Sequence, residues 1–213
     1  MEKIRILCYG DSNTWGYISG SDHQRYGEER WTRILSKILG EKFEIIEEGL
    51  NSRTLLSNDL RPGKQGKNGY EYLIPCLDTH DPINLVIIML GTNELKCNYN
   101  KNAKEIGNMF EEYFVKTILN RKSQINKSHP KLLIIAPPIV NDDVEYYKED
   151  NKYKGATEKS KELGSIYENI ALKYNCYFLG NDGLETGVDG IHLTKDSHKK
   201  LAELLAVKVK EIF

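Results

Sequence analysis

Residues 85–94, with the sequence LVIIMLGTNE, decide the fold class. The first six positions are all apolar and do not alternate with polar ones, as expected of a strand in a parallel sheet that is covered on both faces. The run then stops in a Gly-Thr-Asn-Glu turn. We therefore expect a buried parallel strand that presents polar side chains at its carboxyl end.

Other strand-like runs are spread along the whole chain. They cover residues 4–9, 43–48, 132–137 and, more weakly, 176–180. Helical spacing of apolar residues fills the stretches between them, after Thr157, after Thr194, and at about 29–39 and 103–125. Thr194 is the expected N-cap of the last helix. Strands alternating with helices predict βαβ units, right-handed crossovers and a doubly wound α/β sheet.

The length and the charge of the chain indicate its domain number and the partners it is not expected to bind. A chain of 213 residues fits one domain, residues 1–213. Its 30 Lys and Arg nearly cancel its 31 Asp and Glu, which counts against nucleic acid or an anionic membrane as a partner. No segment approaches the roughly 20 apolar residues of a membrane span. The polar, Tyr-rich segment 141–156 is expected to be an irregular loop, either a lid or plain surface.

The cysteines and the start of the chain suggest where the protein works. Cys8, Cys76, Cys97 and Cys176 are widely spaced and form no CxxC pair. The first ten residues, MEKIRILCYG, have only a short apolar run and are interpreted as a first strand rather than a secretion signal. These features predict a reduced, cytoplasmic protein.

Four polar motifs lie beside the predicted strands and the last helix. GDSN (10–13), GLNSRT (49–54) and GTNE (91–94) each follow a strand, and DGIH (189–192) precedes the final helix. Turns are rich in such residues, so one coincidence would mean little. In a parallel sheet, however, the strand ends meet at one edge, where ligands bind. We expect the motifs to converge there.

The residue types in these motifs suit acyl chemistry. A serine hydroxyl is a poor nucleophile until a base removes its proton, so Ser12 needs an imidazole within reach. His192 is the best of the five histidines, because Asp189 precedes it by three residues and Gly190 allows a tight turn between them. Asp189 would hold the tautomer of the ring. Backbone N–H groups of Ser12 and of the 49–52 turn, with the Asn93 amide, would stabilise an oxyanion.

Other chemistries lack their motifs. The chain has no HExxH or other metal-ligand spacing, no GxGxxG after the first strand and no GxxxxGK[ST]. We therefore expect no metal site and no dinucleotide or P-loop nucleotide site. The GxSxG elbow of α/β-hydrolases is also missing, so a nucleophilic Ser12 would have to belong to a different sequence motif. A serine in a strand-end turn is most often structural.

The four motifs, in this order and at these separations, resemble the four sequence blocks of the SGNH (GDSL-type) hydrolases. Residues 30–35, 43–54, 72–96, 134–138 and 187–194 are similar to the bacterial arylesterase and acyltransferase-like branch. The resemblance implies a three-layer α/β/α sandwich with a five-stranded parallel sheet, flavodoxin-like, without a cofactor. It also implies Ser12 as nucleophile, His192 as base and Asp189 as orienting acid.

The resemblance further implies an oxyanion hole formed by the Ser12 amide, the Asn93 side chain and an amide of the second block. Many relatives use a glycine amide in that block. The matching position here is Ser52, so Gly49 is expected only to shape the turn and is held in reserve as the donor. Two other departures are Asn13, where many members have Leu, and Glu94, where Asp is usual. Asn13 is expected to alter packing but not the reaction, and Glu94 to keep the charge.

Asp11 and Trp15 are assigned to the turn or to the pocket beside the nucleophile. Trp15 either borders the acyl or alcohol pocket or packs beneath the first loop. Members of this branch accept small acyl groups and some transfer them to alcohols. The resemblance therefore predicts a serine esterase for short-chain acetyl and aryl esters, with acyl transfer to alcohols as an associated activity.

Three alternatives remain open at this point. The first is a carbohydrate O-deacetylase of the same family, and the second is a non-catalytic module that binds its ligand in a hydrolase-like pocket. The third is a flavodoxin-like nucleotide binder. The predicted partner is a small-molecule ester. Because relatives are often oligomers, a homo-oligomer built through loops such as 98–102 and 141–156 is a further expectation.

Overall fold

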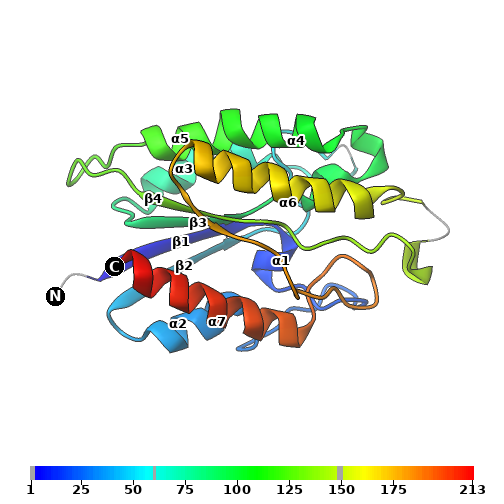
Figure 1. The fold of residues 1–213 in the computed structure, drawn as a ribbon, viewed down its shortest axis with the longest axis horizontal. Coiled ribbons are helices and arrows are strands. Elements are labelled where there is room, and N and C mark those ends of the chain that lie inside the picture. The colour runs from blue at the N-terminus through cyan, green and yellow to red at the C-terminus, as the bar shows by residue number, and fades with distance from the viewer. Residues whose placement is uncertain (1–2, 60, 148–150) are drawn as a thin grey trace.

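A single parallel sheet forms the centre of the computed structural model, which describes residues 3–59, 61–147 and 151–213. The strand order is β2-β1-β3-β4-β5 (Figure 1). The strands are β1 (Ile4–Gly10), β2 (Phe43–Gly49), β3 (Leu85–Met89), β4 (Lys131–Ile135) and β5 (Tyr177–Leu179). All five predicted strand runs are confirmed, and so is the predicted five-stranded parallel α/β fold.

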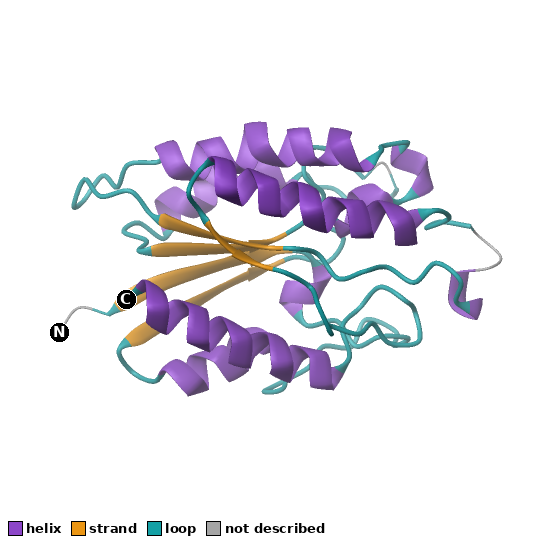
Figure 2. Cartoon of the chain, in the orientation of Figure 1, coloured by secondary structure: helices purple, strands orange, loops and turns teal. Residues whose placement is uncertain are grey.

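Helices cover both faces of the sheet, which makes three layers (Figure 2). The α-helices are α1 (Ser12–Trp15), α2 (Trp31–Leu39), α3 (Gly69–Thr79), α4 (Ala103–Met109), α5 (Lys116–Asn120), α6 (Ala156–Lys173) and α7 (Lys195–Ile212). The shorter elements are η1 (Thr92–Leu95), η2 (Cys97–Tyr99), the π-helical η3 (Phe110–Val115) and η4 (Glu145–Tyr147).

The apolar residues of the strands pack in two clusters, one on each side of the sheet. Alternate side chains of β3 divide between them, because neighbouring side chains of a strand point to opposite faces. Val86 and Ile88 join the cluster under α3, α4 and α6, whereas Leu85 and Ile87 join the one under α2 and α7. Every residue of β3 is buried, which explains its uniformly apolar sequence.

Side chains cap the N-termini of two helices that the sequence predicts. The hydroxyl of Thr194 accepts a hydrogen bond from Ser197 N at 3.1 Å and caps α7, as the sequence predicts. Residues 103–120 form one helical stretch, opened by a capping box in which Asn102 and Glu105 bond each other's backbone. Helix α3 contains Pro75 and was not predicted.

Segment 141–156 is largely irregular in its described parts, as expected. Its first part is tied to the loop before α7, because Asn141 N donates to Gly190 O at 2.8 Å. Asp142 N also donates to the Thr157 hydroxyl at 3.2 Å, which holds the segment against the start of α6. Residues 148–150 lie outside the described part.

The strand order places the site. Strand β2 lies on one side of β1 in the sheet and β3 on the other. The loops that follow β1 and β3 therefore run in opposite directions, and a crevice can form between them at the carboxyl ends of these two strands. Ligands bind at such switch points in doubly wound sheets. Helix α1, which follows β1, lies at this end of the sheet (Figure 1).

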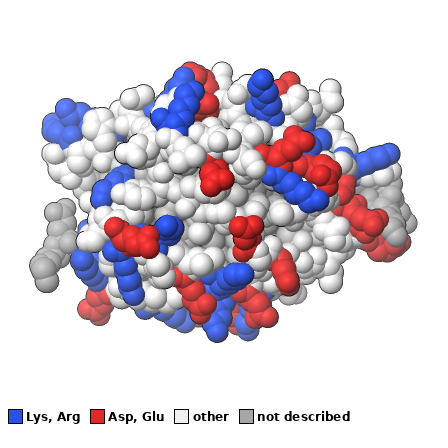
Figure 3. Space-filling model, viewed as in Figure 1, with Lys and Arg blue, Asp and Glu red and all other residues white. Residues whose placement is uncertain are grey.

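The described residues on the face drawn in Figure 3 show no single dominant charge. Acidic and basic side chains are interspersed over the face shown in Figure 3, with ion pairs such as Lys161–Glu158 at 2.7 Å. Within residues 3–59, 61–147 and 151–213, no helix combines the length and apolar character needed to cross a bilayer.

Candidate active site

The turn after β1 presents Ser12 at the edge of the sheet. Asp11 is fully buried and caps the single-turn helix α1, since its Oδ1 accepts a hydrogen bond from Asn13 N at 2.9 Å. Burial raises the pKa of Asp11, while that backbone bond opposes the rise. Gly10 cannot carry a side chain, because a Cβ there would lie 2.5 Å from Met89 O on β3. The cap and the glycine fix Ser12 as the first residue of the helix.

The end of β2 packs directly against this turn. A Cβ on Gly49 would lie 2.3 Å from Trp15 N, so only glycine allows the two backbones to approach so closely. Gly49 therefore shapes the contact between the β2 end and the serine turn. This contact fits the turn role predicted for Gly49, and its reserve role as an oxyanion donor stays a prediction.

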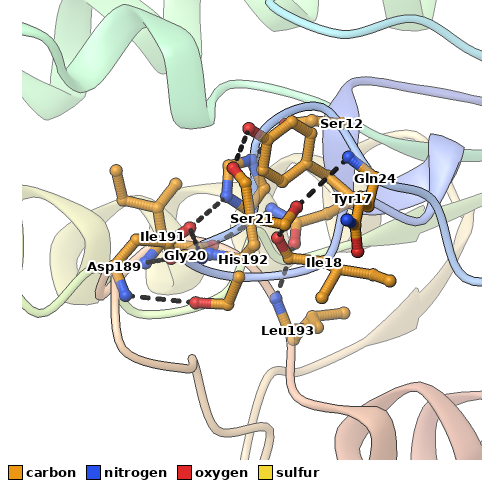
Figure 4. Close-up of polar contacts among 12 residues, drawn as sticks. Ser12, Tyr17, Ile18, Gly20, Ser21, Gln24, Asp189, Ile191, His192 and Leu193 are labelled. Carbon is orange, nitrogen blue, oxygen red and sulfur yellow. Dashed lines mark hydrogen bonds and ion pairs between the residues drawn. The ribbon is translucent and has the colours of Figure 1, made fainter.

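Ser12, His192 and Asp189 form a continuous hydrogen-bonded chain (Figure 4). Ser12 Oγ lies 2.8 Å from His192 Nε2, and His192 Nδ1 lies 2.7 Å from Asp189 Oδ2. Ser12 comes from the start of the chain and the other two from the loop before α7. In this order the acid contacts one ring nitrogen and the hydroxyl the other, so the imidazole can accept the serine proton while the carboxylate faces the opposite N–H.

Asp189 is held as a carboxylate. Burial acts to raise its pKa, but the hydrogen bond and charge of His192, with the backbone N–H groups of Ile191 and His192, hold the pKa well below its ordinary range. Gly20 N also donates to Asp189 Oδ2 at 3.2 Å, and Asp189 N donates to Ser19 Oγ at 3.1 Å. These bonds hold both the side chain and the backbone of Asp189 in place.

Gly190 allows this loop to turn so tightly. Its φ is +67°, and a Cβ there would lie 2.1 Å from Asn141 O. Glycine adopts this left-handed conformation without strain, and its lack of a side chain allows segment 141–156 to approach closely. The sequence predicts only the tight turn at this glycine, and the close approach is a finding of the structure.

Two side chains that the sequence analysis did not assign to the site hold the His192 loop in place. The Tyr17 ring stacks on the imidazole, with 4.3 Å between ring centres and 26° between planes. Asn13, 1% exposed, accepts from Leu193 N at 2.9 Å and donates to Ile191 O at 3.3 Å. Asn13 therefore bonds the backbone on both sides of His192, which corrects the expectation that this residue only alters packing.

The candidate oxyanion donors come from three separate segments, which follow β1, β2 and β3. Ser12 N–H, as the first residue of α1, has no acceptor within its own helix. Ser52 is the third residue of a turn closed by Arg53 N and Leu50 O at 3.0 Å, and its φ is +63°. Asn93 Nδ2 donates one hydrogen to Arg53 O at 2.9 Å, which leaves its second hydrogen for another acceptor.

Lys96 determines which way the Asn93 amide faces. Its Nζ lies 2.5 Å from Asn93 Oδ1, so the amide oxygen is turned to the ammonium and the nitrogen to Arg53 O. Neighbouring Glu94 is fully buried and bonds Leu55 N, and burial raises its pKa to about 8. Burial therefore favours the neutral form of this carboxyl, whereas the sequence predicts that Glu94 keeps the charge of the usual Asp.

Trp15 lies beside the site but is not packed beneath the first loop. It is partly exposed, and its ring sits between the Tyr17 ring, at 6.2 Å, and the Arg25 guanidinium, at 5.0 Å from its centre. Arg25 Nε also donates to Trp15 O at 2.6 Å. The side chain is thereby held next to the ring that stacks on His192.

One group of side chains elsewhere has metal-ligand chemistry. Ligand atoms of Glu48, Cys76 and His80 lie within 4.8 Å of one another. His80 Nε2 is already 2.8 Å from Glu48 Oε1, and burial raises the pKa of the Cys76 thiol to about 12. A neutral thiol beside a hydrogen-bonded carboxylate–imidazole pair is a poor ligand set. The absence of a metal stays a prediction.

Comparison with known proteins identifies the family. A family model described as GDSL-like Lipase/Acylhydrolase matches residues 6–205, nearly the whole chain. The chain belongs to this family. This assignment confirms the resemblance stated from the sequence motifs, and an ester hydrolase as the class of the family.

Solved structures agree with this GDSL-like assignment. The chain is 34% identical to an aryl esterase of M. smegmatis, with all of both chains covered and a TM-score of 0.88. It is 35% identical to a carbohydrate acetylesterase from Sinorhizobium meliloti, with 99% of this chain and 100% of that one covered and a TM-score of 0.89. Both likenesses extend over the complete fold.

A curated relative of this GDSL-like chain is an acetylxylan esterase of Xylanibacter ruminicola. It is 24% identical over 228 residues, which cover 98% of this chain. The chain spans 44% of that relative's length, so the relative contains a large additional part.

Proposed function

We propose that the protein is a carboxylic ester hydrolase that cleaves short-chain acetyl and aryl esters through an acyl-enzyme on Ser12. The observation that carries the proposal is the chain of contacts from Ser12 Oγ to His192 Nε2, 2.8 Å, and from His192 Nδ1 to Asp189 Oδ2, 2.7 Å. Nucleophile, base and orienting acid are thereby within reach of one another.

In the first half-reaction, Ser12 Oγ attacks the ester carbonyl carbon and its proton passes to His192 Nε2. The oxyanion accepts hydrogen bonds from Ser12 N–H, Ser52 N–H and the second Nδ2 hydrogen of Asn93. Collapse of the tetrahedral intermediate breaks the bond to the leaving oxygen, which takes the proton from His192. The alcohol departs and Ser12 remains acylated.

In the second half-reaction, water gives a proton to His192 Nε2 and attacks the acyl carbon. The Ser12 oxygen then leaves, recovers the proton, and the carboxylic acid is released. An alcohol in the place of water would give a new ester, which is the acyl transfer expected from the sequence. Asp189 stays ionised throughout and stabilises the imidazolium.

Carbohydrate O-deacetylation is a second candidate. The likeness to a carbohydrate acetylesterase supports it. The chemistry would be identical, with a sugar hydroxyl as leaving group, so only the alcohol half of the substrate differs. A panel that includes acetylated sugars and aryl acetates of equal acyl size separates the two.

The place of action and the assembly are also proposals. All four cysteines are free thiols, which supports the expected reducing, cytoplasmic setting. A homo-oligomer stays a prediction that the solution mass of the purified protein would check.

The test is hydrolysis of p-nitrophenyl acetate by the wild type and by Ser12→Ala. We expect the variant to lose activity by about 10³-fold or more, because nucleophilic catalysis is removed. Ser165→Ala on the exposed side of α6 is the matched control and should retain full activity. Equal activity in wild type and Ser12→Ala would reject the proposal and favour a ligand-binding module.

A further inference from the structure

A cavity of about 850 Å³ lies next to the candidate oxyanion hole. Its walls come from the segment after β2, including Asp59 and Arg61, from the segment after β3, including Lys96 and Tyr99, and from Lys152. None of these residues belongs to the Ser12–His192–Asp189 chain. The cavity is therefore distinct from the reaction centre itself.

Lys96 joins this cavity to the reaction centre. Its Nζ lies 2.5 Å from Asn93 Oδ1, and Asn93 Nδ2 is the proposed oxyanion donor. Only the width of one amide and two hydrogen bonds separates the ammonium from the oxyanion, a path of no more than about 8 Å. A substrate whose carbonyl is bound at Asn93 can place a group a few bonds away at Lys96.

The Lys96 ammonium contacts the Asn93 amide oxygen and faces the Tyr153 ring, whose centre lies 5.9 Å away. The residue is only 5% exposed, and no carboxylate among the described residues forms an ion pair with its ammonium. One of its three N–H groups is directed to Asn93, which leaves two for another acceptor. Burial and then the charges of Lys152 and Arg61 lower its pKa to about 8.

The rest of the lining adds positive charge. Among the described lining residues, Arg61, Lys96 and Lys152 are basic and Asp59 is the acidic member. Asp59 is engaged by Arg61, with Nε 2.9 Å from Oδ1. The Arg61 hydrogen bonds, which outweigh partial burial, lower the pKa of Asp59 to about 2. Among the described lining residues, basic side chains therefore outnumber acidic ones.

We propose that this cavity binds a carboxylate carried by the substrate, so that the enzyme prefers anionic esters to neutral esters of the same size. The inference rests on the proposed esterase function and names its substrate class. A carboxylate would accept the remaining N–H groups of Lys96 and would lie near the basic side chains of Arg61 and Lys152, whereas a neutral sugar or alkyl group would offer the Lys96 ammonium no counter-charge.

Two matched pairs of esters test the proposal. 4-Acetoxybenzoate and its methyl ester differ in charge on the alcohol half, and mono(4-nitrophenyl) glutarate and 4-nitrophenyl pentanoate differ on the acyl half. For each pair the ratio of kcat/KM, anionic over neutral, is measured in the wild type and in Lys152→Gln. We expect the ratio to fall about fivefold in at least one pair, since one cationic wall charge is lost.

Internal controls separate this effect from damage to the fold. Lys154→Gln removes a charge two residues away on an exposed side chain that does not line the cavity, and it should leave both ratios unchanged. Added NaCl should lower the same ratio that Lys152→Gln lowers. Turnover of phenyl acetate with both ratios unaffected by Lys152→Gln would overturn the proposal, and would leave the esterase function standing.

A binding measurement tests whether the cavity prefers anionic esters, and it does not depend on catalysis. In the Ser12→Ala background, calorimetry with the anionic esters should give tighter binding than with their neutral partners, and Lys152→Gln should weaken only the anionic member. If the wild type hydrolyses no ester but this pattern appears, the esterase proposal fails and the cavity assignment holds. Equal binding of anionic and neutral esters overturns the cavity assignment.

Discussion

The side-chain oxygen of Asn13 accepts a hydrogen bond from the backbone N–H of Leu193 at 2.9 Å. The amide nitrogen of the same side chain donates to Ile191 O at 3.3 Å. One buried side chain, next in sequence to Ser12, thus holds the backbone on either side of His192. These two bonds tie the His192 loop to the turn that carries Ser12.

Replacing Asn13 by Leu, the residue of many relatives, should therefore be harmful in this chain. Two buried backbone groups lose their partners, at a cost of about 2 kcal/mol in the free energy of unfolding. We expect kcat for p-nitrophenyl acetate to fall about tenfold because the His192 loop is released, with KM little changed. Asn13→Asp keeps the acceptor for Leu193 N and should lose less. Full activity in Asn13→Leu would contradict the positioning role.

The stacked Tyr17 ring should restrict the imidazole to its productive orientation. Tyr17→Leu removes the aromatic face and is expected to lower kcat several-fold, because the ring of His192 gains freedom. Tyr17→Phe keeps the stack but loses the 2.8 Å hydrogen bond from the hydroxyl to Ser21 O. We expect near wild-type kcat in the Phe variant. Equal losses in both variants would assign the effect to the loop hydrogen bond.

Ser52 occupies a backbone conformation that favours glycine. With φ at +63°, a side chain is strained there, and the amide, not the side chain, is the proposed donor. Ser52→Gly should raise the free energy of unfolding by about 0.5–1 kcal/mol and preserve kcat. Ser52→Ala keeps the strain and should give no gain. A loss of kcat in the glycine variant would show that the hydroxyl matters.

The sequence was sufficient for the strands and for the residues of the candidate triad. Uniformly apolar runs such as 85–90 are local signals, and the motif order fixes Ser12 and His192 along the chain. Helix Gly69–Thr79 was missed because it contains Pro75 and no clear apolar spacing was recognised there. The roles of Asn13 and Tyr17 could not be predicted, since their partners lie some 180 residues away and only the fold brings them together.

Buried charge states were equally invisible in the sequence. Glu94 was expected to keep the charge of the usual Asp, but complete burial favours its neutral form. Lys96 was not singled out, because a lone lysine gives no sign that it will be buried against Asn93. Such effects follow from the environment of a side chain, not from its identity.

His198 should make stability depend on pH. Burial, and then the charge of His192, lowers its pKa from 6.5 to about 3. On acidification the unfolded chain binds this proton first, so stability is full above pH 6.5 and declines as the pH falls toward 3. The decline is about 1.4 kcal/mol per pH unit from this group.

Urea unfolding at about pH 7 and about pH 5 measures that slope. In His198→Gln the new side chain can still accept the hydrogen bond from Trp31 N. The difference in the free energy of unfolding between the two pH values should be about 2 kcal/mol smaller in this variant than in the wild type. His129→Gln, at an exposed site, is the control and should keep the wild-type difference. An unchanged difference in His198→Gln would mean that His198 is protonated alike in both states.

Covalent labelling tests most directly whether Ser12 is a nucleophile activated by His192. The protein is treated with diethyl 4-nitrophenyl phosphate, and the modified residue is located by peptide mass spectrometry. We expect one diethylphosphoryl group on Ser12, none in Ser12→Ala, and much slower labelling in His192→Ala. Labelling at another residue, or a rate that does not change without His192, would contradict the account.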